Sequence, residues 1–128
     1  MDNITVFFEM HNLKLVSQDS SINFGDSFKI FANDKIAFRV VCERSSTSID
    51  ICSFEERNNW FDLALLRALL NDDKKLNKPM RYEDYICFLK DNIETIETMF
   101  DHNNYSNTRL KLQELEVERI RQLFTGIK

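Results

Sequence analysis

The chain has 128 residues, of which 43% are hydrophobic and 30% charged, and it contains only two glycines and one proline. This balance is that of a single folded domain, and it excludes collagen-like, low-complexity and intrinsically disordered chains. The formal net charge of −4 argues against direct nucleic-acid binding, because a phosphate backbone repels an acidic protein.

The N-terminal part, residues 1–55, has the pattern of β-strands. Apolar residues recur at every second position from Ile4 to Met10, which predicts a first strand. Residues 36–42 form the best predicted strand, since β-branched and aromatic side chains predominate there. Asn33-Asp34 is the predicted hairpin turn before it. Short turns between successive runs predict an antiparallel meander of four or five strands.

The helical part, residues 56–128, begins with a segment that is apolar on nearly every side. It runs from Trp60 to Leu70 and predicts a buried helix, with Trp60 as a core anchor. Two longer helices are predicted over residues 81–100 and 105–124. The expected fold is one α+β domain, in which three C-terminal helices pack on one face of the sheet.

The last predicted helix carries two sets of apolar residues at helical spacing. The first set is Leu112, Leu115, Ile120 and Leu123, and the second is Leu110, Val117 and Phe124. Together they form a broad apolar face. We expect this face to cover one other helix and one edge of the sheet.

The sequence contains no pattern that indicates a membrane segment or a secretory signal. No apolar run approaches the ~20 residues that a membrane-spanning helix needs. Asp2 also stands where a secretory signal carries a basic residue. Cys42, Cys52 and Cys87 are too widely spaced for a CxxC pair. We therefore expect a cytoplasmic protein, not bound to a membrane, with reduced and buried thiols.

No catalytic or metal-binding motif stands out. His11 and His102 are the only histidines, and neither has a second ligand residue at metal-binding spacing. With two glycines in the chain, a phosphate-binding loop is excluded in practice. The sequence therefore predicts no metal, no cofactor and no enzymatic activity, and favours a binding function.

The predicted helix over residues 81–100 carries an acidic stripe. Four of its acids fall within an arc of about 60°, with two more on the flank. The four are Glu83, Glu94, Glu97 and Asp101, and the flanking two are Asp84 and Asp91. Like charges at this spacing do not stabilise a helix, so the stripe is predicted to dock on a basic partner. The alternative is an ordinary solvated surface that keeps the protein in solution.

Three segments resemble a known class of proteins. They are Asn59 to Leu70, Tyr82 to Asn92 and Leu112 to Phe124. Their pattern of apolar anchors and charges is similar to that of small bacterial immunity proteins. These proteins accompany polymorphic and contact-dependent growth-inhibition toxins. The resemblance covers mainly residues 55–124.

The resemblance implies a stoichiometric inhibitor that binds a cognate toxin C-terminal domain and blocks its active site or substrate groove. Many such toxins are nucleases with basic substrate-binding surfaces. An acidic inhibitor surface suits such a partner electrostatically. No contact residue transfers from the family, so the acidic stripe is an inference from this sequence.

Two alternative hypotheses stand beside the inhibitor. The first is a non-catalytic structural or adaptor subunit that forms homo-oligomers or joins a larger assembly through its apolar helix faces. The second is an enzyme of unrecognised type. A pocket that placed His11 or His102 beside Cys87 or a carboxylate would support it.

Overall fold

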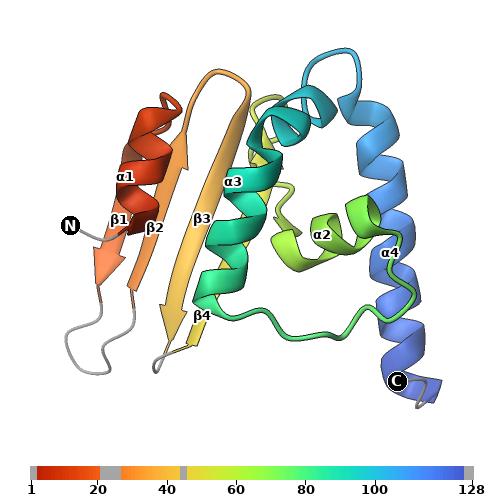
Figure 1. Ribbon diagram of the computed structural model, residues 1–128. Coiled ribbons are helices and arrows are strands. Elements are labelled where there is room, and N and C mark those ends of the chain that lie inside the picture. Colours follow the sequence, from red (N-terminus) through yellow and green to blue (C-terminus); the bar gives the residue numbers. More distant parts are fainter. Residues whose placement is uncertain (1–2, 21–26, 44–45, 126–128) are drawn as a thin grey trace.

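The computed structural model describes residues 3–20, 27–43 and 46–125 (Figure 1). Its helices are α1 (Asn3–Met10), α2 (Leu63–Asn71), α3 (Tyr82–Met99) and α4 (Tyr105–Thr125). Its strands are β1 (Lys14–Ser20), β2 (Ser27–Ala32), β3 (Ile36–Glu43), β4 (Ser46–Ser53) and β5 (Phe61–Asp62). After one short helix, strands therefore dominate the N-terminal part and helices the C-terminal part.

The strands form one antiparallel sheet, in which each strand pairs with its neighbours along the chain. The predicted α+β class and the antiparallel meander are confirmed. The predicted turn between β2 and β3 is also confirmed. Asn33 Oδ1 accepts hydrogen bonds from the backbone N–H groups of Lys35 (2.8 Å) and Ile36 (3.0 Å). A side chain that bonds its own backbone in this way is typical of Asn in tight turns.

The N-terminal segment differs from the prediction. The residues from Ile4 to Met10, predicted as a strand, form helix α1. Ile4, Phe7 and Phe8 share one side of this helix, and all three are buried. Phe8 stacks on Phe38 of β3, with ring centroids 5.0 Å apart. The apolar residues of this segment fit both the two-residue spacing of a strand and the three- to four-residue spacing of a helix. The segment forms a helix because that conformation lets its apolar side pack on the sheet.

The start of α2 also differs from the prediction. The helix expected to begin at Trp60 begins at Leu63, because Asp62 caps it. The N–H of Ala64 donates to Asp62 Oδ1 over 3.0 Å. Phe61–Asp62 is extended and pairs with β4 as the fifth strand. Trp60 is half-buried, so its predicted role as a core anchor is wrong.

The main core lies between the sheet and the helices α1 and α3, which occupy the same face of the sheet (Figure 1). Alternate positions of the strands point toward these helices. Phe31, Phe38 and Ile51 are fully buried there. Leu89 and Ile96 of α3 are equally buried from the other side. This packing fixes the orientation of α3, and with it the direction of its outer side.

Helices α2 and α4 lie toward the β5 edge of the sheet. α2 contacts β4 and β5, and it also contacts α4, which stands at the margin of the molecule and crosses α2 steeply (Figure 1). The two long helices predicted over residues 81–100 and 105–124 are confirmed to within one residue at each end. Of the described helices, none is long and apolar enough to cross a membrane.

The three cysteines are unpaired thiols in different surroundings. Cys52 is buried, as expected, and burial raises the pKa of its thiol to about 11. Cys42 is half-buried and Cys87 is exposed. The expectation of buried thiols is therefore wrong for Cys87.

Candidate functional site

The acids predicted to bind a partner lie on the outward side of α3 or directly after it. We call this set the acidic face: Glu83, Asp84, Asp91, Glu94, Glu97 and Asp101. The other side of α3 carries core residues such as Tyr85 and Leu89. Because that side packs on the sheet, the acidic face is turned away from it.

Three carboxylates of the acidic face are exposed and unpaired. In the part of the chain that the structure describes, no basic group lies within 4.0 Å of Glu83, Asp91 or Glu94. Lys90, the one base predicted within the stripe, is also exposed. These three carboxylates can therefore accept a cation without breaking an internal bond.

The other three acids hold local structure. Asp84 accepts the N–H of Arg81 over 2.9 Å and so caps α3. Glu97 lies 3.9 Å from Lys35 Nζ in the β2–β3 turn. Asp101 Oδ1 accepts backbone N–H groups after α3, including that of Asn104 over 2.9 Å. The predicted stripe therefore divides into three free carboxylates and three already engaged in the fold.

The face of the sheet opposite to α1 and α3, which we call the open face, carries an ion-pair network that the sequence analysis missed. Arg39 of β3 donates from Nε (3.2 Å) and Nη2 (2.8 Å) to Asp50 Oδ2 of β4, its register partner. Asp50 is in turn the register partner of Asp62 in β5. Arg119 of α4 donates to Asp62 Oδ2 over 2.8 Å. The network therefore links β3, β4, β5 and α4.

The surroundings of this network balance its charges. Burial raises the pKa of the Asp50 carboxyl, although the neighbouring Arg39 guanidinium lowers it. The same guanidinium lies 4.6 Å from the centroid of the Trp60 ring. Each carboxylate has its own arginine, so the network stabilises the β5 edge and leaves no charge free for a ligand.

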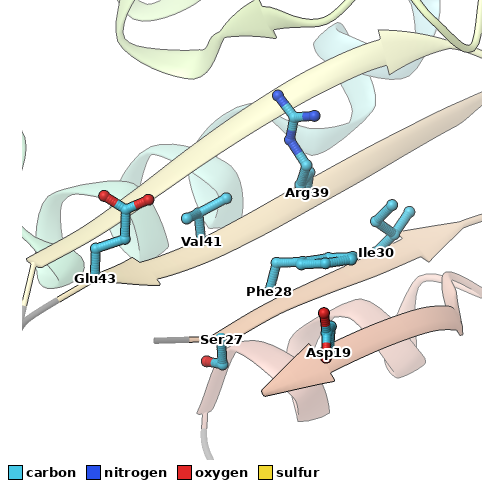
Figure 2. A pocket seen from close by; sticks show the side chains of 7 residues that line it. All are labelled: Asp19, Ser27, Phe28, Ile30, Arg39, Val41 and Glu43. Carbon is cyan, nitrogen blue, oxygen red and sulfur yellow. The ribbon is translucent and has the colours of Figure 1, made fainter. Parts of the chain in front are cut away.

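A cavity of about 420 Å³ opens on the open face beside the network (Figure 2). It is lined by Asp19, Ser27, Phe28, Ile30, Arg39, Val41 and Glu43. Figure 2 shows these residues on β1, β2 and β3, with the side chains of Phe28, Arg39 and Val41 on the open face. Its apolar surface comes from β2 and β3, and it is bordered by the carboxylates of Glu43 on β3 and Asp19 on β1 and by the guanidinium of Arg39 on β3. Such a surface suits an apolar group of a partner.

The segment between β4 and β5 contacts the start of α4. Glu56 Oε1 accepts hydrogen bonds from Tyr105 Oη (2.6 Å) and Arg109 Nη1 (3.2 Å), and these lower the pKa of Glu56. His102 Nδ1 contacts the Glu55 carboxylate, and this hydrogen bond raises the pKa of His102. Both residues line a surface cavity of about 400 Å³.

The pair of His102 and Glu55 is a histidine–carboxylate contact of the kind that would support the enzyme hypothesis. The side chain of His102 is 87% exposed, and Glu55 is its only hydrogen-bond partner among the described residues. No nucleophile is therefore hydrogen-bonded to His102 in the described part of the chain. Within the same residues, no group of three or more His, Cys, Asp or Glu side chains could hold a metal ion.

Most of the apolar side chains on α4 are exposed, contrary to prediction. Leu112 is buried and Leu115 is partly buried. We call the exposed set the α4 stripe: Leu110, Val117, Ile120, Leu123 and Phe124. The expectation that these residues cover another helix and a sheet edge is wrong, because α4 turns a different side toward α2.

Comparison of the chain with known protein families, with curated proteins and with solved structures finds no significant match.

Proposed function

We propose that this protein is an immunity-type inhibitor. It binds the basic C-terminal domain of a cognate bacterial toxin, of the nuclease class, in the cytoplasm of the producing cell. Binding covers the active site or substrate groove of the toxin, and the inhibitor itself performs no chemistry. The observation that carries this proposal is a set of exposed carboxylates, those of Glu83, Asp91 and Glu94, that have no basic partner among the residues the structure describes.

The placement of these carboxylates suits a basic groove for an electrostatic reason. A nuclease binds phosphates with lysine and arginine side chains, so its groove attracts any close array of negative charge. Such complementarity accelerates association and selects the orientation of the complex. Unpaired carboxylates lose only hydration on binding, whereas engaged ones also lose an internal partner.

The engaged acids take a supporting role in this proposal. Asp84, Glu97 and Asp101 lie beside the free set but hold the helix start, the β2–β3 turn and the turn after α3. They therefore add to the negative potential and keep α3 rigid. We expect the direct contacts to come from the three free carboxylates.

The test uses the toxin domain encoded by the gene immediately upstream of this one. Binding of the purified domain is measured for the wild type and for the combined variant Glu83→Lys, Asp91→Lys, Glu94→Lys. We expect the dissociation constant to rise at least about 100-fold, with a weaker dependence on salt. The catalytic activity of the toxin should no longer be inhibited by the variant at equimolar ratio.

A second variant with the same change of charge is the control. Glu9, Asp34 and Glu114 are exposed acids outside the acidic face, and all three are changed to lysine. This control should keep most of the affinity. Equal loss in both variants would contradict a specific role for α3, and an upstream gene without such a toxin domain would contradict the inhibitor.

A specific observation favours the adaptor alternative as a second candidate. The α4 stripe leaves a line of apolar side chains in water, as a subunit of a larger assembly would. If the adaptor is correct, the upstream toxin domain does not bind the chain, and charged substitutions in the α4 stripe abolish its assembly with other subunits. If the inhibitor is correct, charged substitutions on α3 abolish toxin binding and those in the α4 stripe leave it unchanged.

A further inference from the structure

The α4 stripe has the spacing of a coiled-coil seam. Leu110, Val117 and Phe124 are seven residues apart, and Ile120 follows Val117 by three. Positions seven apart, with an apolar residue three further on, form the contact line of paired helices. Val117 is 69% and Phe124 86% exposed. The contact line is therefore open to solvent over at least the two helical turns between these residues.

Except for Leu123, the α4 stripe lies on a different side of the helix from the one that packs on the protein. Leu112 is fully buried there. Gln122 accepts the N–H of Leu76 over 3.0 Å and donates to the carbonyl of Lys74 over 2.7 Å. These contacts attach α4 to the segment after α2. The α4 stripe is therefore an additional apolar side on a helix that is already held in place.

The size of the stripe matches a small specific interface. Covering its five side chains on two molecules would remove on the order of 1,000 Å² of apolar surface from water, about the lower limit for a specific interface. The stripe lies on the helix at the margin of the molecule (Figure 1). A second molecule can therefore approach it without meeting the sheet.

We propose that the α4 stripe binds a second copy of this chain as a parallel pair of helices. In a parallel pair, each residue of the contact line packs against the same residue of the other copy. A residue on one side of the contact line lies next to the residue five positions later in the sequence of the other copy. Glu116 and Arg121 flank the seam at this spacing, on opposite sides. Each copy thus places Glu116 beside Arg121 of the other, twice by symmetry.

The charges around the stripe favour this occupant. Arg121 already holds Glu118 within its own chain, and its guanidinium has further N–H groups for a second carboxylate. The dimer uses a surface other than the acidic face, so it does not depend on the proposed inhibitor function.

The first test is the mass of the protein in solution, measured by light scattering over a range of concentrations. The chain mass is 15.2 kDa, so a dimer has twice this value, about 30 kDa. We expect Val117→Lys to raise the dimer dissociation constant at least about tenfold. Val16 is similarly exposed on β1, so Val16→Lys is the matched control and should leave the dimer intact.

A monomeric wild type at several hundred micromolar would overturn the proposal, as would an oligomer that Val117→Lys does not weaken. Unchanged circular dichroism separates loss of the dimer from loss of the fold. Binding of the wild type, but not of Val117→Lys, to anionic lipid vesicles in place of self-association would also overturn it.

The second test addresses orientation. In a Cys87→Ser background, the Phe124→Cys variant should form a disulfide-linked dimer on mild oxidation, because parallel helices bring the two positions together. An antiparallel pair would hold them several turns apart. A dimer that Val117→Lys dissociates but that Phe124→Cys does not cross-link would overturn the parallel arrangement.

Discussion

The helices α3 and α4 have similar lengths, 18 and 21 residues, but present opposite kinds of outer surface. Both bury one side in the protein. The outer side of α3 carries free carboxylates, whereas that of α4 carries exposed apolar side chains. A charged side is stable in water and attracts a partner at long range. An apolar side gains free energy only when something covers it.

This difference separates two kinds of interaction in one molecule. The acidic face is suited to fast, salt-dependent association with a basic partner. The α4 stripe is suited to a contact driven by burial of apolar area and weakly sensitive to salt. The two surfaces share no residue, so each can be disabled without the other.

The largest effect on the free energy of unfolding is expected from substitutions on opposite sides of α4. Leu112 is 0% and Leu110 55% exposed, and the two lie on opposite sides of the helix, so the same substitution compares a buried and an open position. Leu112→Ala should lower the free energy of unfolding by about 2–5 kcal/mol, because it leaves a cavity. Leu110→Ala should change it by less than about 0.5 kcal/mol.

Urea unfolding at low micromolar concentration, where α4 is uncovered, measures both variants. Similar losses for the two would mean that the exposed side of α4 is covered in the monomer. In that case α4 would not present an apolar outer side to solvent, and it would no longer differ from α3 in this respect.

The next effect concerns the polar attachment of α4. Gln122→Ala removes the acceptor of the buried N–H of Leu76, so the free energy of unfolding should fall by about 1–3 kcal/mol. Gln113 is an exposed glutamine on the same helix, and Gln113→Ala is the control that should have little effect. Equal values in thermal or urea unfolding would show that α4 is held by its apolar contacts alone.

A smaller effect, on affinity for the toxin domain, tests the role of the acidic face on α3. Lys90 is the base among the free carboxylates, and Lys90→Glu makes the outer side uniformly acidic. We expect affinity for the toxin domain to increase about threefold at low salt, mainly through a faster association rate. Binding kinetics at two salt concentrations provide the measurement. A decrease in affinity would place Lys90 itself in contact with a carboxylate of the partner.

The smallest effect concerns the turn that joins the two helices. Glu55 raises the pKa of His102 in the folded protein above its ordinary value of 6.5. The stabilisation is therefore present below about pH 6.5 and is lost as the pH rises through the folded-state pKa. His102→Asn should lower the Tm slightly at pH 5.5 and leave it unchanged at pH 8.5. A Tm difference independent of pH would show that the contact with Glu55 does not involve the charged imidazole.

Several elements were predictable because their pattern is local. The strand at residues 36–42, the turn at Asn33 and the helices over 81–100 and 105–124 follow from spacing and composition. The structure of the first segment was not predictable in this way. Ile4, Phe7 and Phe8 have the spacing of a helix, whereas the apolar residues at every second position have the spacing of a strand. Contact with a distant ring, that of Phe38, decides between them.

The candidate site was predictable to a lesser degree. A helical wheel places all six acids on one side of α3, but it does not show which ones already have partners. Glu97 is engaged by Lys35, which lies about sixty residues earlier in the chain. The open-face network had a signal in the sequence. Arg39 and Asp50 each interrupt a run of apolar strand residues, and such charges need partners when the strands pair.

By itself, the sequence determined the α+β order, the strand meander, the two long helices and the sign of the charge on the outer side of α3. These properties depend on residues a few positions apart, where backbone geometry sets the spacing. Only the tertiary structure decided that the first segment is a helix and that α4 leaves an apolar side open. It also decided that Glu83, Asp91 and Glu94 pair with no base within the described ranges of the chain. Burial and pairing depend on neighbours brought together by the fold, and no local pattern encodes them.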